Sequence, residues 1–395
     1  MTSIDRWQLP DGIEEVLPAQ AATVERLRRD LLDLYRSWGY ELILPPFIEY
    51  LDGLLTGTGH DLDLKTFKLI DQLSGRLLGL RADMTPQAAR IDAHRLQHDA
   101  PSRLCYLGTV LHTRPDGFAG SRSPLQVGAE LFGHAGVESD VEILALMVAT
   151  LELTGVEDIY IDLGHVGIYR GLASDAGLDE DQEACLFDAL QRKAIPEINE
   201  FLGGLDLSTA QRERLAALAT LNGDSEVLQR ATALLEGSGD AARNALENLG
   251  RIATLASQRL PDVTLHFDLA ELRGYQYQTG VVFAAFVADH GKEVARGGRY
   301  NEIGKVFGRA RPATGFSTDL RTLMRFGNLD WPPMRKSILA TNDDDAALAD
   351  RVGQLRAAGE AVIQQLPGQE GTFAEMGCDR ILRWNGTEWA VEALA

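Results

Sequence analysis

Residues 103–132, RLCYLGTVLHTRPDGFAGSRSPLQVGAELF, decide the expected architecture of this chain. Two apolar runs, RLCYLGTVLH and PLQVGAELFG, flank a polar, glycine-rich loop at 113–123, and this pattern predicts two strands. In the second run Gln126, Gly128 and Glu130 share one face, because side chains alternate in direction along a strand. That face is either the polar wall of a pocket or the solvated side of a half-exposed sheet.

The residues on either side of these runs predict helices, a strand and a hairpin. Apolar residues spaced by three and four predict a helix over 18–38, and ELIL before two prolines predicts a strand over 41–44. FKLI and RLLGL enclose turn residues, which predicts a hairpin over 66–82. We expect one helix to begin with Thr85 as its N-cap, and another to begin with a capping box at 139–142.

The second half of the chain changes composition twice. Residues 165–260 are rich in Ala, Leu, Glu, Arg and Gln with helical periods, which predicts an all-helical insertion of four or five helices. Strand composition returns over 263–288 and is followed by a turn at 289–291. The segment Trp331-Pro332-Pro333 predicts a linker.

The last residues predict a small α/β unit. SILAT predicts a strand, residues 344–358 predict a helix that the acidic run Asp343–Asp345 caps, and RILRW and TEWAV predict a hairpin with an Asn-Gly turn. The whole chain is therefore expected to have an α+β fold, with an antiparallel sheet core, flanking helices, a helical insertion and a small C-terminal unit. The expected domains are a core at 1–164 and 261–330, the insertion at 165–260 and the C-terminal unit at 331–395.

The composition excludes several classes of protein. The 395 residues are 45% hydrophobic and 24% charged, which is typical of a folded protein of two or three domains. Three separated cysteines without a CxxC pair argue against a disulfide scaffold or a cysteine-ligated zinc site, and they fit a reducing cytosol. A net charge of −20 is unfavourable for general nucleic-acid binding. The chain has no run of 18 apolar residues and its start lacks the apolar core of a signal peptide, so we expect a cytoplasmic protein without a membrane span.

Few short motifs of known chemistry are present. The sequence has no Walker loop, GxSxG elbow or HExxH, and His94 and His98, four residues apart, are interpreted as solvated side chains and not as metal ligands. In LRGYQYQTGVVF (272–283) an arginine and two tyrosines precede an apolar strand. That arginine either meets an anion or reaches solvent at the end of the strand.

Taken in order, these stretches resemble histidyl-tRNA synthetase and its class II relatives. The matching segments are WGYELILPPFIEY (38–50), LRADMTPQAAR (80–90), RLCYLGTVLHTRP…SRSPLQVGAE (103–130), ELRGYQYQTGVVF (271–283) and ARGGRYNEIGKVFG…PATGFSTDLRTL (295–323). The first resembles the helix and strand that such synthetases use to dimerise. The resemblance covers about residues 10–328 and implies the class II synthetase-like sheet.

The chain departs from the synthetase at the motifs that bind ATP. The second motif of the synthetase has Arg-x-Glu, whereas this chain has His112 and Arg114. The third motif has Gly-Leu-Glu-Arg, whereas this chain has Asp319-Leu320-Arg321-Thr322, with its arginine one position early. On a helix one position turns a side chain by about 100 degrees, so the guanidinium is expected to point away from an adenine. We therefore expect no aminoacylation.

The amino-acid side of the synthetase pocket is better retained. The resemblance implies that this pocket binds histidine through carboxylates for the ammonium, an arginine for the carboxylate and polar partners for the ring. Gln278 replaces the second tyrosine of the synthetase's Tyr-Tyr pair, which leaves the selectivity for an imidazole open. The expected histidine-binding residues are Asp83, Thr85, Gln126, Glu130, Arg273, Tyr277 and Gln278.

A histidine-shaped pocket without the ATP motifs resembles the family of regulatory subunits of ATP phosphoribosyltransferase. RGYQYQTGVVFAAF is closer to that family than to an active synthetase, and the acidic residues 331–395 are too few for a full anticodon-binding domain, so no tRNA partner is expected. The resemblance implies a non-catalytic protein with no cofactor or metal. It would dimerise, join the short catalytic subunit in a hetero-octamer, activate it and transmit feedback inhibition by the allosteric ligand L-histidine.

Two other functions remain open at this point. The chain could be a divergent histidyl-tRNA synthetase or a stand-alone amino-acid ligase, and His112, Arg114 and Thr322 argue against both. It could also sense an amino acid for another partner such as a kinase, although no kinase-like segment is fused to it.

Overall fold

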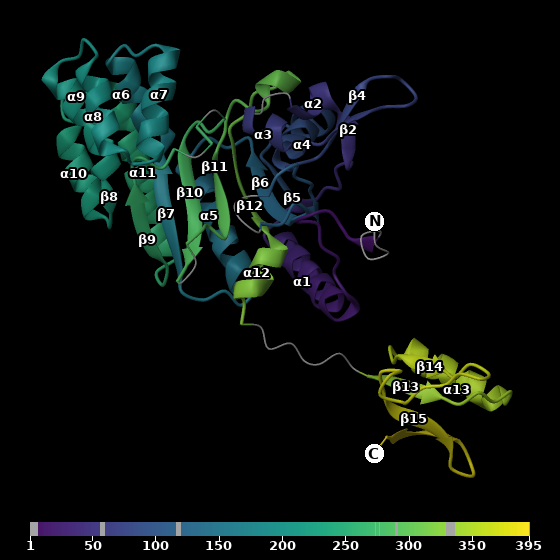
Figure 1. Cartoon of the computed structure of the whole chain (residues 1–395). Helices are drawn as coiled ribbons and strands as arrows, with labels where there is room; N and C mark the ends of the chain where they lie inside the picture. Colours follow the sequence, from purple (N-terminus) through teal and green to yellow (C-terminus); the bar gives the residue numbers. More distant parts are fainter. Residues whose placement is uncertain are drawn as a thin grey trace. The chain divides into compact units, whose positions relative to one another are not determined.

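The computed structural model describes residues 7–55, 60–115, 120–272, 274–275, 277–288, 291–328 and 336–394. The chain forms two compact units, Met1–Leu329 and Asp330–Ala395 (Figure 1). The predicted linker at 331–333 lies outside the described residues, and of the predicted turn at 289–291 only Gly291 is described.

The first unit is built on a large mixed sheet. The two strands predicted from residues 103–132 are confirmed as β5 (Ser102–Thr109) and β6 (Leu125–Phe132), and they pair antiparallel. Within the described ranges nine strands lie in the order β1 (Glu41–Leu42), β5, β6, β12 (Ala313–Asp319), β11 (Ala295–Arg299), β10 (Val281–Val287), β7 (Ile159–His165), β9 (Thr264–Asp268) and β8 (Asn222–Gly223). Pairing is antiparallel from β5 to β7 and parallel where β1 joins β5 and β9 joins β7. The α+β fold with an antiparallel core is therefore confirmed.

Long helices pack on this sheet. α5 (Val137–Leu153) contacts the central strands, and α1 (Pro18–Ser37) and α11 (Asp240–Arg259) pack against α5. Leu27, Leu31 and Tyr35, each four residues apart, are the buried residues of α1, whereas Leu34 and Trp38 are half-buried.

The predicted capping box of α5 is wrong. The helix begins at Val137, two residues before the predicted cap, and Gly136 is its N-cap. Ser139 Oγ donates to the carbonyl oxygen of Gly136 at 2.7 Å. Glu142 is bound to Arg103 of β5 at 2.7 Å, so a contact distant in sequence takes the side chain that the box required.

Residues 166–259 lie between the adjacent parallel strands β7 and β9 and contain more helices than predicted. All of these residues are described, and they form α6 (Val166–Asp175), α7 (Glu180–Gln191), α8 (Ile195–Gly203), α9 (Thr209–Ala217), α10 (Glu226–Leu234) and α11. The predicted number was too low because the glycine pairs are not the only breaks: the single Gly177, with a φ of +68°, ends α6, and Asp179 then starts α7 with a capping box. The segment is also not all-helical, since β8 joins the large sheet.

A second, smaller sheet leads to the pocket. β2 (Ile48–Tyr50), β4 (Leu77–Leu80) and β3 (Lys68–Ile70) are antiparallel, which confirms the predicted hairpin. α4 (Thr85–Arg90) follows, but its N-cap is Met84 and not Thr85, because the Thr85 hydroxyl bonds to Tyr106. Three further short α-helices of this unit are α2 (Leu51–Leu55), α3 (His60–Lys65) and α12 (Leu320–Phe326).

The second unit has its own sheet and core. Its strands lie in the order β14 (Val362–Gln364), β13 (Ser337–Ala340), β15 (Cys378–Trp384) and β16 (Trp389–Ala393), and α13 (Ala346–Ala357) packs on them. Asp345 caps α13, as predicted. The β15–β16 hairpin is confirmed, but Trp384 pairs with Trp389, so the connection is four residues long and not a two-residue Asn-Gly turn.

Candidate functional site

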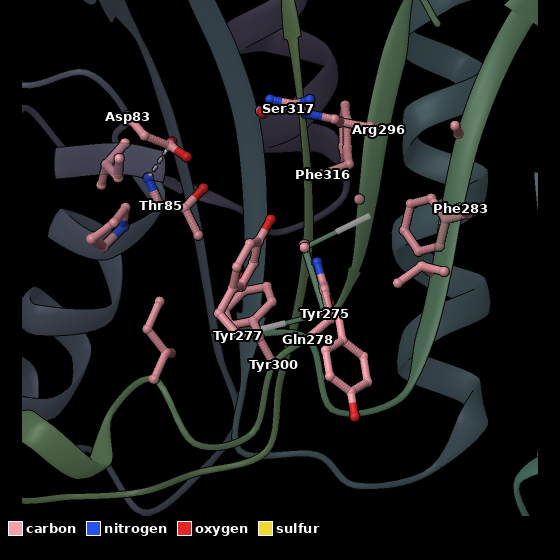
Figure 2. Close-up of a pocket in the computed structure, with 18 of the residues that line it drawn as sticks. Asp83, Thr85, Tyr275, Tyr277, Gln278, Phe283, Arg296, Tyr300, Phe316 and Ser317 are labelled. Atoms are coloured by element: carbon pink, nitrogen blue, oxygen red, sulfur yellow. Dashed lines mark hydrogen bonds between the residues drawn. The ribbon is translucent and has the colours of Figure 1, made fainter. Parts of the chain in front are cut away.

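A cavity of about 270 Å³ lies in the first unit where α3, the start of α4, the large sheet and the segment before β10 meet (Figure 2). Five of the predicted residues line it: Asp83, Thr85, Glu130, Tyr277 and Gln278. Gln126 does not line the cavity but is hydrogen-bonded to Asp83, and Arg273 lies outside the described residues. The volume is below that of a typical drug-sized site, so it suits a small polar molecule.

One wall of the cavity is a carboxylate that neighbouring groups hold in place. Gln126 Nε2 donates to Asp83 Oδ1 at 2.7 Å, and the Thr85 amide donates to the same oxygen at 2.9 Å. The Met84 amide donates to Gln126 Oε1 at 2.9 Å, which fixes the orientation of the Gln126 side chain. Gln126 therefore reaches the cavity only through Asp83, which it orients.

The second carboxylate, Glu130, is buried in the sheet. Tyr106 donates to Glu130 Oε1 at 2.8 Å, and the Tyr300 hydroxyl donates to Oε2. The Tyr106 hydroxyl also bonds to Thr85 Oγ1 at 3.0 Å, so the two walls share one network. Burial raises the pKa of Glu130 to about 8, against the lowering effect of the tyrosine hydrogen bonds.

The glycine on the shared face of β6 has a specific role. Tyr106 lies opposite Gly128 in the β5–β6 register. A Cβ on Gly128 would be 2.6 Å from the Tyr106 hydroxyl oxygen and 2.5 Å from the Phe316 carbonyl oxygen. The space that this glycine leaves is therefore filled by the tyrosine that binds Glu130, and the β6 face is a pocket wall and not a solvated surface.

The third wall is a tight segment between β9 and β10. The amides of Tyr277 and Gln278 both donate to the carbonyl oxygen of Gly274, at 2.9 and 2.8 Å. Gly274 has a φ of +71°, which a side chain would strain. The turn presents Tyr277 next to Tyr300, with ring centroids 6.5 Å apart, and places the buried Gln278 at the cavity (Figure 2).

The charges of the cavity suit a zwitterion. Asp83 supplies an anionic group for an ammonium, and Glu130 supplies a buried carboxyl group that a bound ammonium would help to ionise. Lys65 and Arg296 also line the cavity and are cationic. Gln278 offers an amide to a polar ring.

Residues at the synthetase's ATP motifs make contacts within the protein. His112 Nε2 lies 2.9 Å from the carbonyl oxygen of Ala82, and Arg114 is exposed. Asp319 caps α12 and accepts from the Leu125 amide at 2.9 Å. Arg321 Nη1 lies 3.8 Å from Glu14 Oε2.

Some residues of the site were not predicted. Tyr106 and Tyr300 both lie within the segments that resemble the synthetase, but the sequence alone indicates no role for them. A glycine inside a strand was the available signal for Tyr106, because such a glycine marks a close approach. Nothing local marked Arg170, whose contact with the pocket segment crosses 105 residues.

Two other kinds of site are absent from the described residues. The described residues contain no group of three or more His, Cys, Asp or Glu side chains that could hold a metal ion. In the same ranges, no helix is long and apolar enough to span a membrane.

Comparisons with families cover almost the whole chain. The family model for histidyl-tRNA synthetase matches residues 12–323. The model for the ATP phosphoribosyltransferase subunit HisZ C-terminal domain matches residues 335–392.

Individual relatives agree with these matches. The ATP phosphoribosyltransferase regulatory subunit of Thioalkalivibrio sulfidiphilus is 61% identical over 395 residues, and both chains are fully covered. That of Alkalilimnicola ehrlichii is 57% identical over 99% of this chain and 98% of its own. Among solved structures, an ATP phosphoribosyltransferase regulatory subunit/histidyl-tRNA synthetase from Bacillus halodurans matches with a TM-score of 0.82 at 28% identity, covering 93% of this chain and 95% of that one. The histidyl-tRNA synthetase of a Nostoc species shares the class II fold, with a TM-score of 0.76 at 20% identity over 95% of this chain and 91% of its own.

Proposed function

Because this chain belongs to the family of ATP phosphoribosyltransferase regulatory subunits, we propose that it regulates an ATP phosphoribosyltransferase in histidine biosynthesis and catalyses no reaction of its own. It assembles with the catalytic subunit, supports its activity and lets histidine inhibit it. As a biosynthetic regulator it acts in the cytoplasm.

The observation that carries the histidine assignment is the arrangement of charge around the cavity. Asp83 and Glu130 suit the ammonium, and the amide of Gln278 suits the imidazole. Arg273, by its resemblance to the synthetase's arginine, binds the carboxylate. Histidine is therefore the allosteric ligand, and no cofactor or metal is required.

The contacts at the ATP motifs support the non-catalytic role. Adenylate formation requires cations placed at the phosphates of ATP. The Arg321 guanidinium faces Glu14, and His112 is buried against a backbone carbonyl. Neither side chain is placed to neutralise a phosphate. A divergent synthetase or ligase is therefore the weaker alternative.

Exposed apolar side chains support self-association. On the small three-stranded sheet, Ile48, Tyr50 and Leu69 share one face and Ile70 and Leu77 share the other, and each is between 41% and 65% exposed. Exposed apolar clusters of this kind mark interfaces. We assign this sheet to a dimer contact, and the dimers to a hetero-octamer with the short catalytic subunit. The acidic second unit argues against tRNA as a partner.

The decisive experiment measures phosphoribosyl-ATP formation by the short catalytic subunit of the same genome, with and without this chain, across a histidine titration. We expect stimulation by the chain and inhibition by histidine. Unchanged rates in every mixture would remove the proposal, and histidine-dependent exchange of pyrophosphate into ATP by this chain alone would establish the synthetase alternative.

A further inference from the structure

The chain between β9 and β10, described at residues 269–272, 274–275 and 277–280, lines the cavity, and we call it the pocket segment. Helices from the segment between β7 and β9 pack against it. Arg170, in α6, donates from Nη2 to the carbonyl oxygen of Tyr275 at 2.5 Å and from Nη1 to that of Gln278 at 2.9 Å. Both acceptors are backbone groups of the segment that lines the cavity, which includes Tyr277.

Aromatic contacts reinforce this support. The guanidinium carbon of Arg170 lies 4.5 Å from the centroid of the Tyr275 ring. The rings of Tyr169 in α6 and Phe187 in α7 lie 5.4 and 5.2 Å from the same centroid. Two helices of the insertion therefore hold the side chain and the backbone of Tyr275 together.

The ends of the pocket segment are held by the core, whereas its middle is held by Arg170. On the upstream side, Asp268 Oδ1 accepts from the Ala270 amide at 3.0 Å. On the downstream side, the Thr279 amide donates to the carbonyl oxygen of Arg299 at 2.7 Å. A planar guanidinium can donate to two carbonyl oxygens from a fixed fork, and burial, which lowers the pKa of Arg170, leaves it charged at neutral pH.

We propose that Arg170 is a positioning residue of the pocket, which fixes the backbone at Tyr275 and at Gln278 and so couples ligand occupancy to the helical insertion. The inference rests on the proposed function for the identity of the ligand. When the pocket segment is already ordered, less conformational entropy is lost on ligand binding. Arg170 therefore raises the affinity for the ligand without touching it. By linkage, a ligand that orders Tyr277 and Gln278 also orders α6, and a partner that moves α6 changes ligand affinity.

The test compares three variants of the full chain by calorimetric titration with L-histidine. Arg170→Gln removes the charged fork and is expected to weaken binding at least tenfold. Arg170→Lys keeps the charge without the fork and is expected to be intermediate. Gln191→Ala is the matched control, because Gln191 Nε2 also donates from the insertion to a backbone carbonyl, that of Ala270 at the upstream end of the segment, at 3.3 Å, but neither Gln191 nor Ala270 lines the cavity. We expect it to bind as the wild type does.

Hydrogen exchange provides a second measurement, which would not change if Arg170 had only a structural role. In the wild type, histidine should protect the amides of both Tyr275–Gln278 and α6. In Arg170→Gln, histidine should no longer protect the amides of α6. Without histidine, this variant should exchange faster than the wild type at Tyr275–Gln278 only. If this variant does not fold, Arg170→Lys carries the same comparison.

The outcomes separate the two proposals. Wild-type affinity in both Arg170 variants, or an equal loss in Gln191→Ala, overturns the positioning role. A wild type that does not bind histidine removes the proposed ligand instead, and exchange in the ligand-free variants then still decides whether Arg170 orders the segment.

Discussion

Glu130 is the residue that sets the electrostatics of the pocket. Glu130 is 1% exposed, and burial raises its pKa from 4.5 to about 8. At pH 7 the empty pocket therefore holds a proton on Glu130. An ammonium that binds beside it favours the ionised form and displaces that proton.

We expect histidine binding at pH 7.5 to release up to one proton from Glu130, which is mostly protonated in the empty pocket at this pH. The ring of free histidine is mostly neutral at pH 7.5, so it carries no proton that binding could release. Calorimetry in buffers of different ionisation enthalpy measures this number. Glu130→Gln, which has no proton to lose, is the control. A binding enthalpy that does not depend on the buffer in the wild type would contradict the assignment.

The same carboxyl group makes stability depend on pH. Between pH 4.5 and about 8 the folded state holds one more proton at Glu130 than the unfolded state, so the free energy of unfolding falls as the pH rises through this window. The shift corresponds to a contribution of about 4–5 kcal/mol that is present at low pH and lost above pH 8. Urea unfolding of Glu130→Gln should lack this decline. Parallel pH profiles for the two proteins would rule it out.

At the scale of elements, β6 depends on a glycine where the pocket network crosses the sheet. We expect Gly128→Ala to destabilise the protein by about 2–3 kcal/mol, since its Cβ would collide with Tyr106 and with the backbone of Phe316. It should also weaken histidine binding, because Tyr106 supports Glu130. Gly250→Ala is the matched control: Gly250 lies in α11 with open space around its Cβ position, so the change should stabilise the helix by about 1 kcal/mol. Equal effects in urea unfolding would show that the β6 contact is unimportant.

The elements also show where local sequence stops being sufficient. α1 and the β3–β4 hairpin follow their patterns, because their own side chains decide which face is buried. The starts of α4 and α5 do not. Thr85 and Glu142, which local rules assign to caps, are bound to Tyr106 and Arg103 of β5. A cap that competes with a buried tertiary hydrogen bond cannot be chosen from neighbouring residues alone.

At the scale of the whole molecule, the pocket lies entirely within Met1–Leu329. Saturating histidine should therefore stabilise that unit, by about 2.7 kcal/mol at a hundredfold excess over Kd, and leave Asp330–Ala395 unchanged. Hydrogen exchange at increasing denaturant, followed in β6 and in β13, distinguishes the two. A shift of similar size in both would mean that the units unfold as one.

The sequence by itself determined the α+β class, the order of most elements, the family resemblance and the set of polar residues offered to a ligand. These follow from periodicity and from motifs whose residues are close in the chain. Only the tertiary structure decided that Gln126 acts through Asp83, that Gly128 makes room for Tyr106, and that Arg170 supports the pocket from a helix 105 residues away. Such roles depend on distance in space and on burial, which change pKa values and hydrogen-bond partners, and chain spacing does not contain them.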